Sequence, residues 1–70
     1  MKMYRSDVRH RLTHIREIAG DAEAAHSAQD ALFREVLVAI ASGDVSPETA
    51  RLIADDALEV DDIEFERWMA

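Results

Sequence analysis

LFREVLVAIA, residues 32–41, is the most apolar segment of the 70-residue chain, and it decides the fold. On a helix its apolar side chains lie on nearly every side. A helix that is apolar all round is either buried in a core or lies in an interface, so we expect protein to cover this segment on all sides. Small chains without disulfides often need oligomerisation for stability. The segment therefore favours a homodimer, and its candidate residues for self-association are Leu32, Phe33, Val36, Leu37 and Ile40.

The same helix extends towards the N-terminus into a part rich in alanine. Alanine favours helix and leaves room for another helix to approach closely. Asp21 is a suitable N-cap, and Gly43-Asp44-Val45 is the break that follows Ser42. These signals predict a helix over residues 21–42.

An apolar stripe precedes this helix, with Tyr4, Val8, Leu12, Ile15 and Ala19 at spacings of three and four residues. This spacing predicts a helix over residues 7–19, with Ser6 or Asp7 as its N-cap. Gly20 follows, which is a common position for a left-handed residue that ends a helix.

Two further start signals follow residue 45. Ser46-Pro47 combines a capping serine with a proline in the first helical position, and it predicts a helix over residues 47–58. Asp61 and Glu64 have the spacing of a capping box, which predicts a helix over residues 61–69. We expect that last helix to dock through Phe65 and Trp68.

Four short helices with short connections predict an all-α fold, a small antiparallel helical bundle of three to four helices in one domain, residues 1–70. With 49% hydrophobic and 33% charged residues, the chain is too apolar for a disordered acidic tail. It has no cysteine for a disulfide or a thiolate site. Its longest uncharged stretch, residues 36–43, is too short to span a bilayer, and its first residues do not resemble a signal peptide. We therefore expect a cytoplasmic protein.

The net charge of −7 is unevenly distributed. Residues 1–19 hold five basic and two acidic side chains, whereas residues 20–70 hold three basic and thirteen acidic ones. Repulsion from phosphates argues against direct nucleic-acid binding. The candidate partner-binding residues form an acidic set: Glu48, Asp55, Asp56, Glu59, Asp62 and Glu66. Carboxylates are unfavourable near a helix C-terminus, so either the arginines of the first helix or a basic partner should offset part of this set.

Two groups of histidines and acids have spacings that are compatible with chemistry. His10 and His14 lie one helical turn apart, and Glu17 follows three residues later, but neighbouring arginines would repel a cation. His26 and Asp30 are also one turn apart, which suits either an oriented general base or a structural contact. The interpretation is that these groups are structural. We predict no metal, no cofactor, no catalytic residue and no enzymatic activity.

Two segments resemble small proteins encoded by phages and prophages of high-GC bacteria. They are GDAEAAHSAQDAL at residues 20–32, followed by the apolar residues up to 41, and IEFERWMA at residues 63–70. The resemblance covers residues from about 9 to 70. It implies a phage accessory protein with a helical fold, acting in the host cytoplasm, and it implies no mechanism.

Together these features predict a non-enzymatic accessory protein that acts by protein–protein interaction with a partner whose identity the sequence does not give. The alternative hypothesis is an acidic inhibitor that occupies the nucleic-acid-binding site of a host or defence enzyme. A metal-dependent enzyme that uses His10, His14, Glu17 or the acidic side chains is a third hypothesis, which has less support because no converging pocket is apparent.

Overall fold

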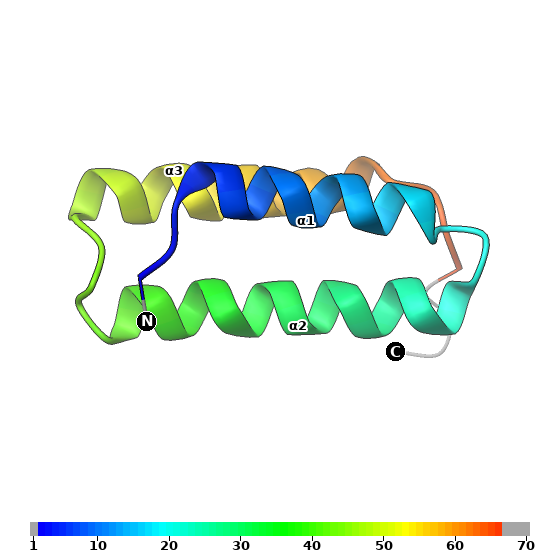
Figure 1. Ribbon diagram of the computed structural model, residues 1–70, viewed down its shortest axis with the longest axis horizontal. Helices are drawn as coiled ribbons and strands as arrows, with labels where there is room; N and C mark the ends of the chain where they lie inside the picture. The colour runs from blue at the N-terminus through cyan, green and yellow to red at the C-terminus, as the bar shows by residue number, and fades with distance from the viewer. Residues whose placement is uncertain (1, 67–70) are drawn as a thin grey trace.

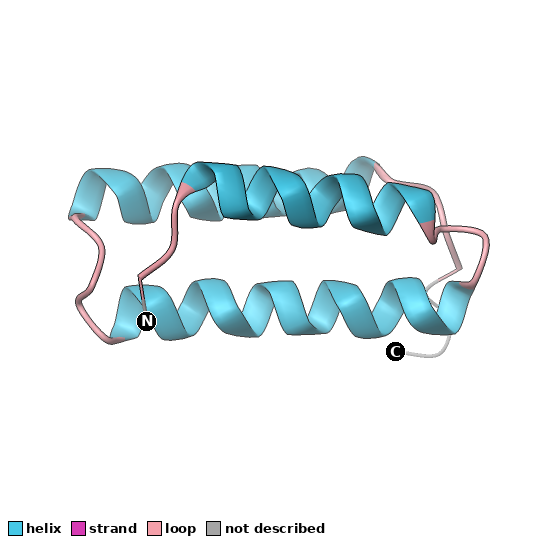
Figure 2. Ribbon diagram, in the orientation of Figure 1, coloured by secondary structure: helices cyan, strands magenta, loops and turns pink. Residues whose placement is uncertain are grey.

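The computed structural model describes residues 2–66, and these form three α-helices and one 3-10 turn, with no strand among them. The elements are α1 (Arg5–Glu17), α2 (Ala22–Ala41), α3 (Pro47–Leu58) and η1 (Glu59–Asp62), and Figure 2 shows how short the connections are. The prediction of an all-α fold is confirmed for this part of the chain.

Two of the helices begin at the residues that the sequence indicates. The side chain of Asp21 accepts a hydrogen bond from the Ala24 backbone N–H at 3.1 Å, and α2 follows it. The Ser46 hydroxyl accepts one from the Thr49 backbone N–H at 3.1 Å, with Pro47 in the first position of α3. Both side chains satisfy N–H groups that have no partner within the helix.

The start of α1 differs from the prediction. The helix begins at Arg5, because Tyr4 is extended and serves as the N-cap. The Asp7 carboxylate accepts a hydrogen bond from the Tyr4 backbone N–H at 2.8 Å, so it acts from the third helical position and not as the cap. The helix ends at Glu17, two residues before the predicted end.

A second correction concerns the glycines. Gly20 does not have the positive φ expected of a left-handed helix end, whereas Gly43, after α2, has a φ of 77°. Only glycine adopts that conformation without steric cost, because it lacks a Cβ atom.

Gly43→Ala is therefore expected to lower the free energy of unfolding by about 1 kcal/mol through backbone strain alone, because no atom lies within 4 Å of the added Cβ. Gly20→Ala is the matched control, since its added Cβ also meets nothing within 4 Å and its φ is not positive. This control should leave stability unchanged or raise it by a few tenths of a kcal/mol. Urea unfolding measures both effects, and equal losses in the two variants would contradict the assignment.

The three helices lie along one another in an elongated bundle whose Cα extents are 34, 19 and 15 Å. In Figure 1 the chain runs towards the right through α1, back through α2 and towards the right again through α3. Each helix contacts the other two. The arrangement leaves α2 with α1 and α3 on one side only.

The core lies where the three helices meet. Ala25 and Ala39 are fully buried and allow close packing against α2, because an alanine side chain occupies little space. Met3, which precedes α1, is also buried, and the helical stripe of α1 gave no indication of this. The buried apolar side chains are Met3, Val8, Leu12, Ile15, Ala25, Leu32, Val36, Ala39, Ile53, Ala57, Val60 and Ile63.

The predicted helix over residues 61–69 is wrong in the part that the structure describes. Residues 59–62 form the 3-10 turn η1, and residues 63–66 are not helical. Val60 and Ile63 are buried and hold this segment on the bundle, so the chain follows those contacts and not the local capping signal. Phe65 packs partly buried against the core, as expected, whereas Trp68 lies outside the described residues.

Over residues 2–66, no helix combines the length and the apolar character that crossing a membrane requires.

Candidate functional site

The outer side of α2 is exposed to solvent. Leu37 is 66% exposed, Val38 41% and Ile40 36%, although all three belong to the most apolar segment of the chain. The expectation that protein covers this segment on all sides is therefore wrong for the single chain. The two helices α1 and α3 cover only the side of α2 that faces them, and a side chain on the opposite side of a helix cannot reach that core.

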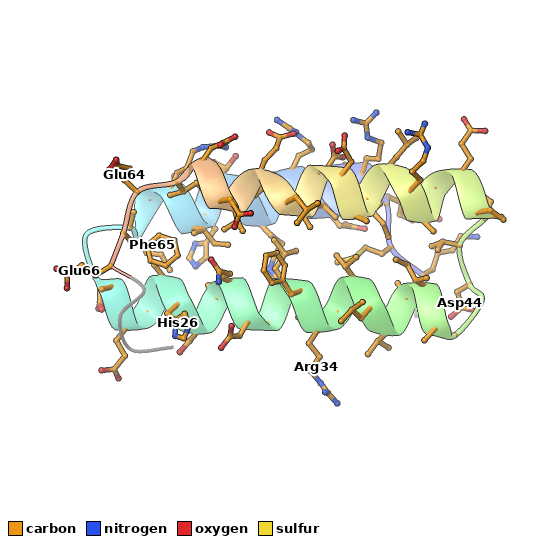
Figure 3. The ribbon with its side chains drawn as sticks, turned by 180° about the vertical axis from the view of Figure 1, so that it is seen from behind. His26, Arg34, Asp44, Glu64, Phe65 and Glu66 are labelled. Atoms are coloured by element: carbon orange, nitrogen blue, oxygen red, sulfur yellow. The ribbon has the colours of Figure 1, made fainter. Side chains whose placement is uncertain are left out.

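An apolar groove runs between α2 and α3, on the side of the bundle that Figure 3 shows. It encloses about 260 Å³, and its lining is apolar throughout. We call it the α2–α3 groove, and define it by its lining residues: Phe33, Val36, Leu37, Ala54, Ala57 and Leu58. Leu58, on α3, is 58% exposed, and Leu37 stands on the α2 side. Two large exposed leucines thus flank a hollow that two alanines help to line.

Some of the residues predicted for self-association are buried in the structure, and others are exposed. Leu32 is fully buried and Val36 is 4% exposed, so neither presents a free surface. Their side chains pack in the core of the single chain, because they lie on the side of α2 that faces the other two helices. Phe33 is partly buried, and Leu37 and Ile40 reach the surface.

The sequence interpretation missed Leu58 as a surface residue. It lies one helical turn after Ala54, which is consistent with the buried stripe of α3 as well as with an exposed side. Its exposed position follows from the direction in which α1 and α2 approach α3, and helix periodicity alone does not give that direction.

The carboxylate of Asp56 is the centre of the ion-pair network between α1 and α3. Arg5 donates two hydrogen bonds to it, from Nε at 2.8 Å and from Nη2 at 3.0 Å. Arg9 lies 3.6 Å from the same carboxylate and donates a hydrogen bond to Glu59 at 2.7 Å. The hydrogen bonds from Arg5 hold the pKa of Asp56 below its usual value, and burial opposes this shift in part.

This network shows that two of the six carboxylates predicted to bind a partner are bonded within the fold. Asp56 is 2% exposed and bonded to Arg5, so it is not available to a partner, and Glu59 is bonded to Arg9. The arginines of α1 thus offset the acidic end of α3 within the fold. The remaining members, Glu48, Asp55, Asp62 and Glu66, lie at the surface.

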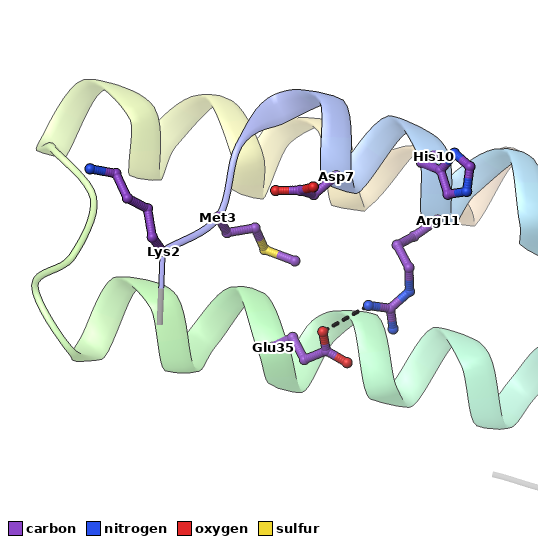
Figure 4. A pocket seen from close by; sticks show the side chains of 6 residues that line it. All are labelled: Lys2, Met3, Asp7, His10, Arg11 and Glu35. Carbon is purple, nitrogen blue, oxygen red and sulfur yellow. Dashed lines mark hydrogen bonds and ion pairs between the residues drawn. The ribbon is translucent and has the colours of Figure 1, made fainter.

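The histidines of α1 do not form a metal centre with other described residues, because nowhere in residues 2–66 do three His, Asp or Glu side chains come together at a spacing that could hold an ion. His10 lines an open hollow of about 350 Å³ between α1 and α2, shown in Figure 4. Arg11 closes one side of that hollow by donating a hydrogen bond to Glu35 at 2.8 Å. The other carboxylate that lines this hollow is that of Asp7, which accepts a hydrogen bond from the Tyr4 backbone N–H at the start of α1.

His26 and Asp30 are brought together only loosely. His26 Nε2 lies 3.9 Å from Asp30 Oδ1, which exceeds the length of a hydrogen bond. Figure 3 shows His26 on α2 at the same end of the bundle as Phe65. In this structure Asp30 therefore does not orient His26 as a general base, which would need a short hydrogen bond between them.

Comparison with known proteins finds no matching family model, no matching curated protein and no matching solved structure. Function therefore has to be inferred from the chemistry of the chain itself. The feature that distinguishes this surface is the α2–α3 groove, because it brings an apolar hollow together with two exposed leucines, and clustered exposed apolar side chains mark sites of interaction.

Proposed function

We propose that this protein is a non-enzymatic interaction module that binds a protein partner through the α2–α3 groove. The observation that carries the proposal is the exposure of Leu37 and Leu58 beside a hollow with an apolar lining. Burying a fully exposed leucine is worth about 1.5–3 kcal/mol, and because Leu37 and Leu58 are already partly covered, burying either one completely is worth about 1–2 kcal/mol. An apolar groove flanked by large side chains is a usual form of docking site for a protein partner.

The alternative proposal, an acidic inhibitor of a nucleic-acid-binding enzyme, has less support. Such an inhibitor needs a row of carboxylates that are free to imitate phosphates. Asp56 is buried and Glu59 is bonded to Arg9, so two of the six carboxylates are already committed to α1. The arginines that hold them also reduce the negative potential on this side of the molecule.

The resemblance to phage-encoded accessory proteins adds a class of partner to the proposal. It favours a host or phage protein in the cytoplasm over a small molecule. The apolar groove is consistent with this, because it offers no polar group to orient a small polar ligand.

The test is affinity capture from a lysate of the source cells, with the wild type, Leu37→Glu and Leu58→Glu as baits. We expect at least one protein to be retained by the wild type and lost by both groove variants, since each places a charge in an apolar contact. Tyr4→Ser is the matched control, because Tyr4 is 57% exposed but lies at the start of α1. Circular dichroism establishes that all four proteins are helical.

Two results would contradict the proposal. One is a partner that is retained by the groove variants but lost when Glu48, Asp55 and Asp62 are reversed in charge, which would support the acidic inhibitor. The other is the absence of any protein whose retention depends on Leu37 or Leu58.

A further inference from the structure

Charged residues accompany the two exposed leucines of the α2–α3 groove. Their order along the chain is opposite on the two helices, so their order in space is the same, because α2 and α3 run in opposite directions. On α2, Asp30 and Arg34 lie seven and three residues before Leu37. On α3, Arg51 and Asp55 lie seven and three residues before Leu58. Residues at these spacings share one side of a helix, so each exposed leucine is accompanied by one acid and one arginine.

This rim is balanced, although the whole chain carries a net charge of −7. All four rim residues are exposed, and within residues 2–66 neither Arg34 nor Arg51 forms an ion pair. A strongly basic partner would be repelled by the two arginines, and a strongly acidic partner by the two aspartates. An identical chain carries an equally balanced rim, so neither repulsion applies to it.

The shape of the groove also suits a second copy of this chain. The exposed leucines form the projections, and the hollow that Ala54 and Ala57 help to line forms the recess. A surface with both a projection and a recess can pack against its own copy about a two-fold axis. With that axis along the groove, α2 of each chain lies on α3 of the other.

The area also favours a second chain over a single helix. A stable interface buries about 800 Å² on each partner. The whole bundle extends 34 by 19 Å between Cα atoms along its two longer axes, which are the two seen in Figure 3. A single helix, about 10 Å wide, covers only about half of that width. A second copy presents two helices side by side and covers all of it.

We infer that the α2–α3 groove is the interface of a symmetric homodimer, in which Leu37 and Leu58 of each chain pack into the groove of the other. This inference rests on the proposed function, because it names the partner that the same groove binds.

The first test is sedimentation velocity of the purified full chain from micromolar to millimolar concentration. We expect a dimer, and at least about a 30-fold higher dissociation constant for Leu37→Glu and for Leu58→Glu, as for hot-spot residues. Tyr4→Ser should dimerise like the wild type. Circular dichroism has to show that both groove variants keep their helices.

The second test identifies the two contacting surfaces. Arg34→Glu with Arg51→Glu makes the rim wholly acidic, and Asp30→Lys with Asp55→Lys makes it wholly basic. Each double variant should be monomeric, because like charges then face each other across the interface. An equimolar mixture of the two should form a heterodimer, which native mass spectrometry identifies by its mass.

Three outcomes would overturn the inference. A wild type that is monomeric at every concentration excludes the homodimer, and groove-dependent capture of another protein would then still support the proposed function. A dimer that both groove variants preserve places the interface elsewhere. A mixture of the two double variants that forms no heterodimer shows that the two rims do not face each other.

Discussion

Leu32→Ala is expected to lower the free energy of unfolding by about 2–5 kcal/mol, the usual cost of truncating a fully buried leucine. Leu32 is 0% exposed and lies in the cluster where the three helices meet. A 70-residue domain is stable by only about 4–10 kcal/mol, so this loss is a large fraction of the total. Urea unfolding at one fixed protein concentration, followed by circular dichroism, measures it.

Leu37→Ala is the matched control, since it makes the same chemical change on the same helix at a residue that is 66% exposed. At concentrations where the protein is monomeric, this variant should stay within about 0.5 kcal/mol of the wild type. Leu32→Val removes less volume and gives a measurable value if the alanine variant does not fold. Equal losses for Leu32→Ala and Leu37→Ala would contradict the assignment of one leucine to the core and the other to the surface.

The contrast between these leucines marks the limit of prediction from the sequence. Both belong to a segment that is apolar on nearly every side, so periodicity cannot say which residues face the other helices. That choice depends on the direction from which α1 and α3 approach α2. The sequence correctly indicated that the segment is important for packing, but the division between core and groove required the tertiary arrangement.

Local signals, which depend on only a few neighbouring residues, correctly predicted where two of the three helices begin. Asp21 and Ser46-Pro47 begin α2 and α3 as expected, because an N-cap needs only the next three residues. The capping box at Asp61 and Glu64 has the same local character, but α3 continues directly into the 3-10 turn η1, and buried Val60 anchors that turn. A tertiary contact overrode the local preference there.

The charge pattern indicated an imbalance but not how the fold resolves it. An excess of carboxylates near the end of α3 and an excess of arginines on α1 were visible in the composition. Arg5 and Asp56 are 51 residues apart, however, and nothing in local spacing pairs them. Their pairing shows why sequence analysis overestimated the acidic set: a carboxylate that satisfies an arginine within the fold cannot serve a partner.

Asp56→Asn is expected to lower the free energy of unfolding at pH 7 by about 1–2 kcal/mol. Asparagine keeps the volume and removes the charge that accepts two hydrogen bonds from Arg5. Hydrogen bonds to charged groups are worth about 1.5–3 kcal/mol, and the value is reduced here because the Arg5 side chain is 53% exposed and therefore partly solvated. Asp55→Asn, at the exposed neighbouring position, should stay within about 0.5 kcal/mol.

The loss of unfolding free energy caused by Asp56→Asn should be largest near neutral pH and should become smaller in acid. The folded state lowers the pKa of Asp56, so its stabilising effect is complete above the unfolded value of about 3.9 and is lost as the pH falls through the lower folded value. Urea unfolding of both proteins from pH 7 to pH 2 should give a constant difference above about pH 5 and a difference that shrinks below about pH 4. A difference that persists unchanged at pH 2 would show that the substitution acts through the shape of the side chain, and that the ion pair with Arg5 does not stabilise the contact between α1 and α3.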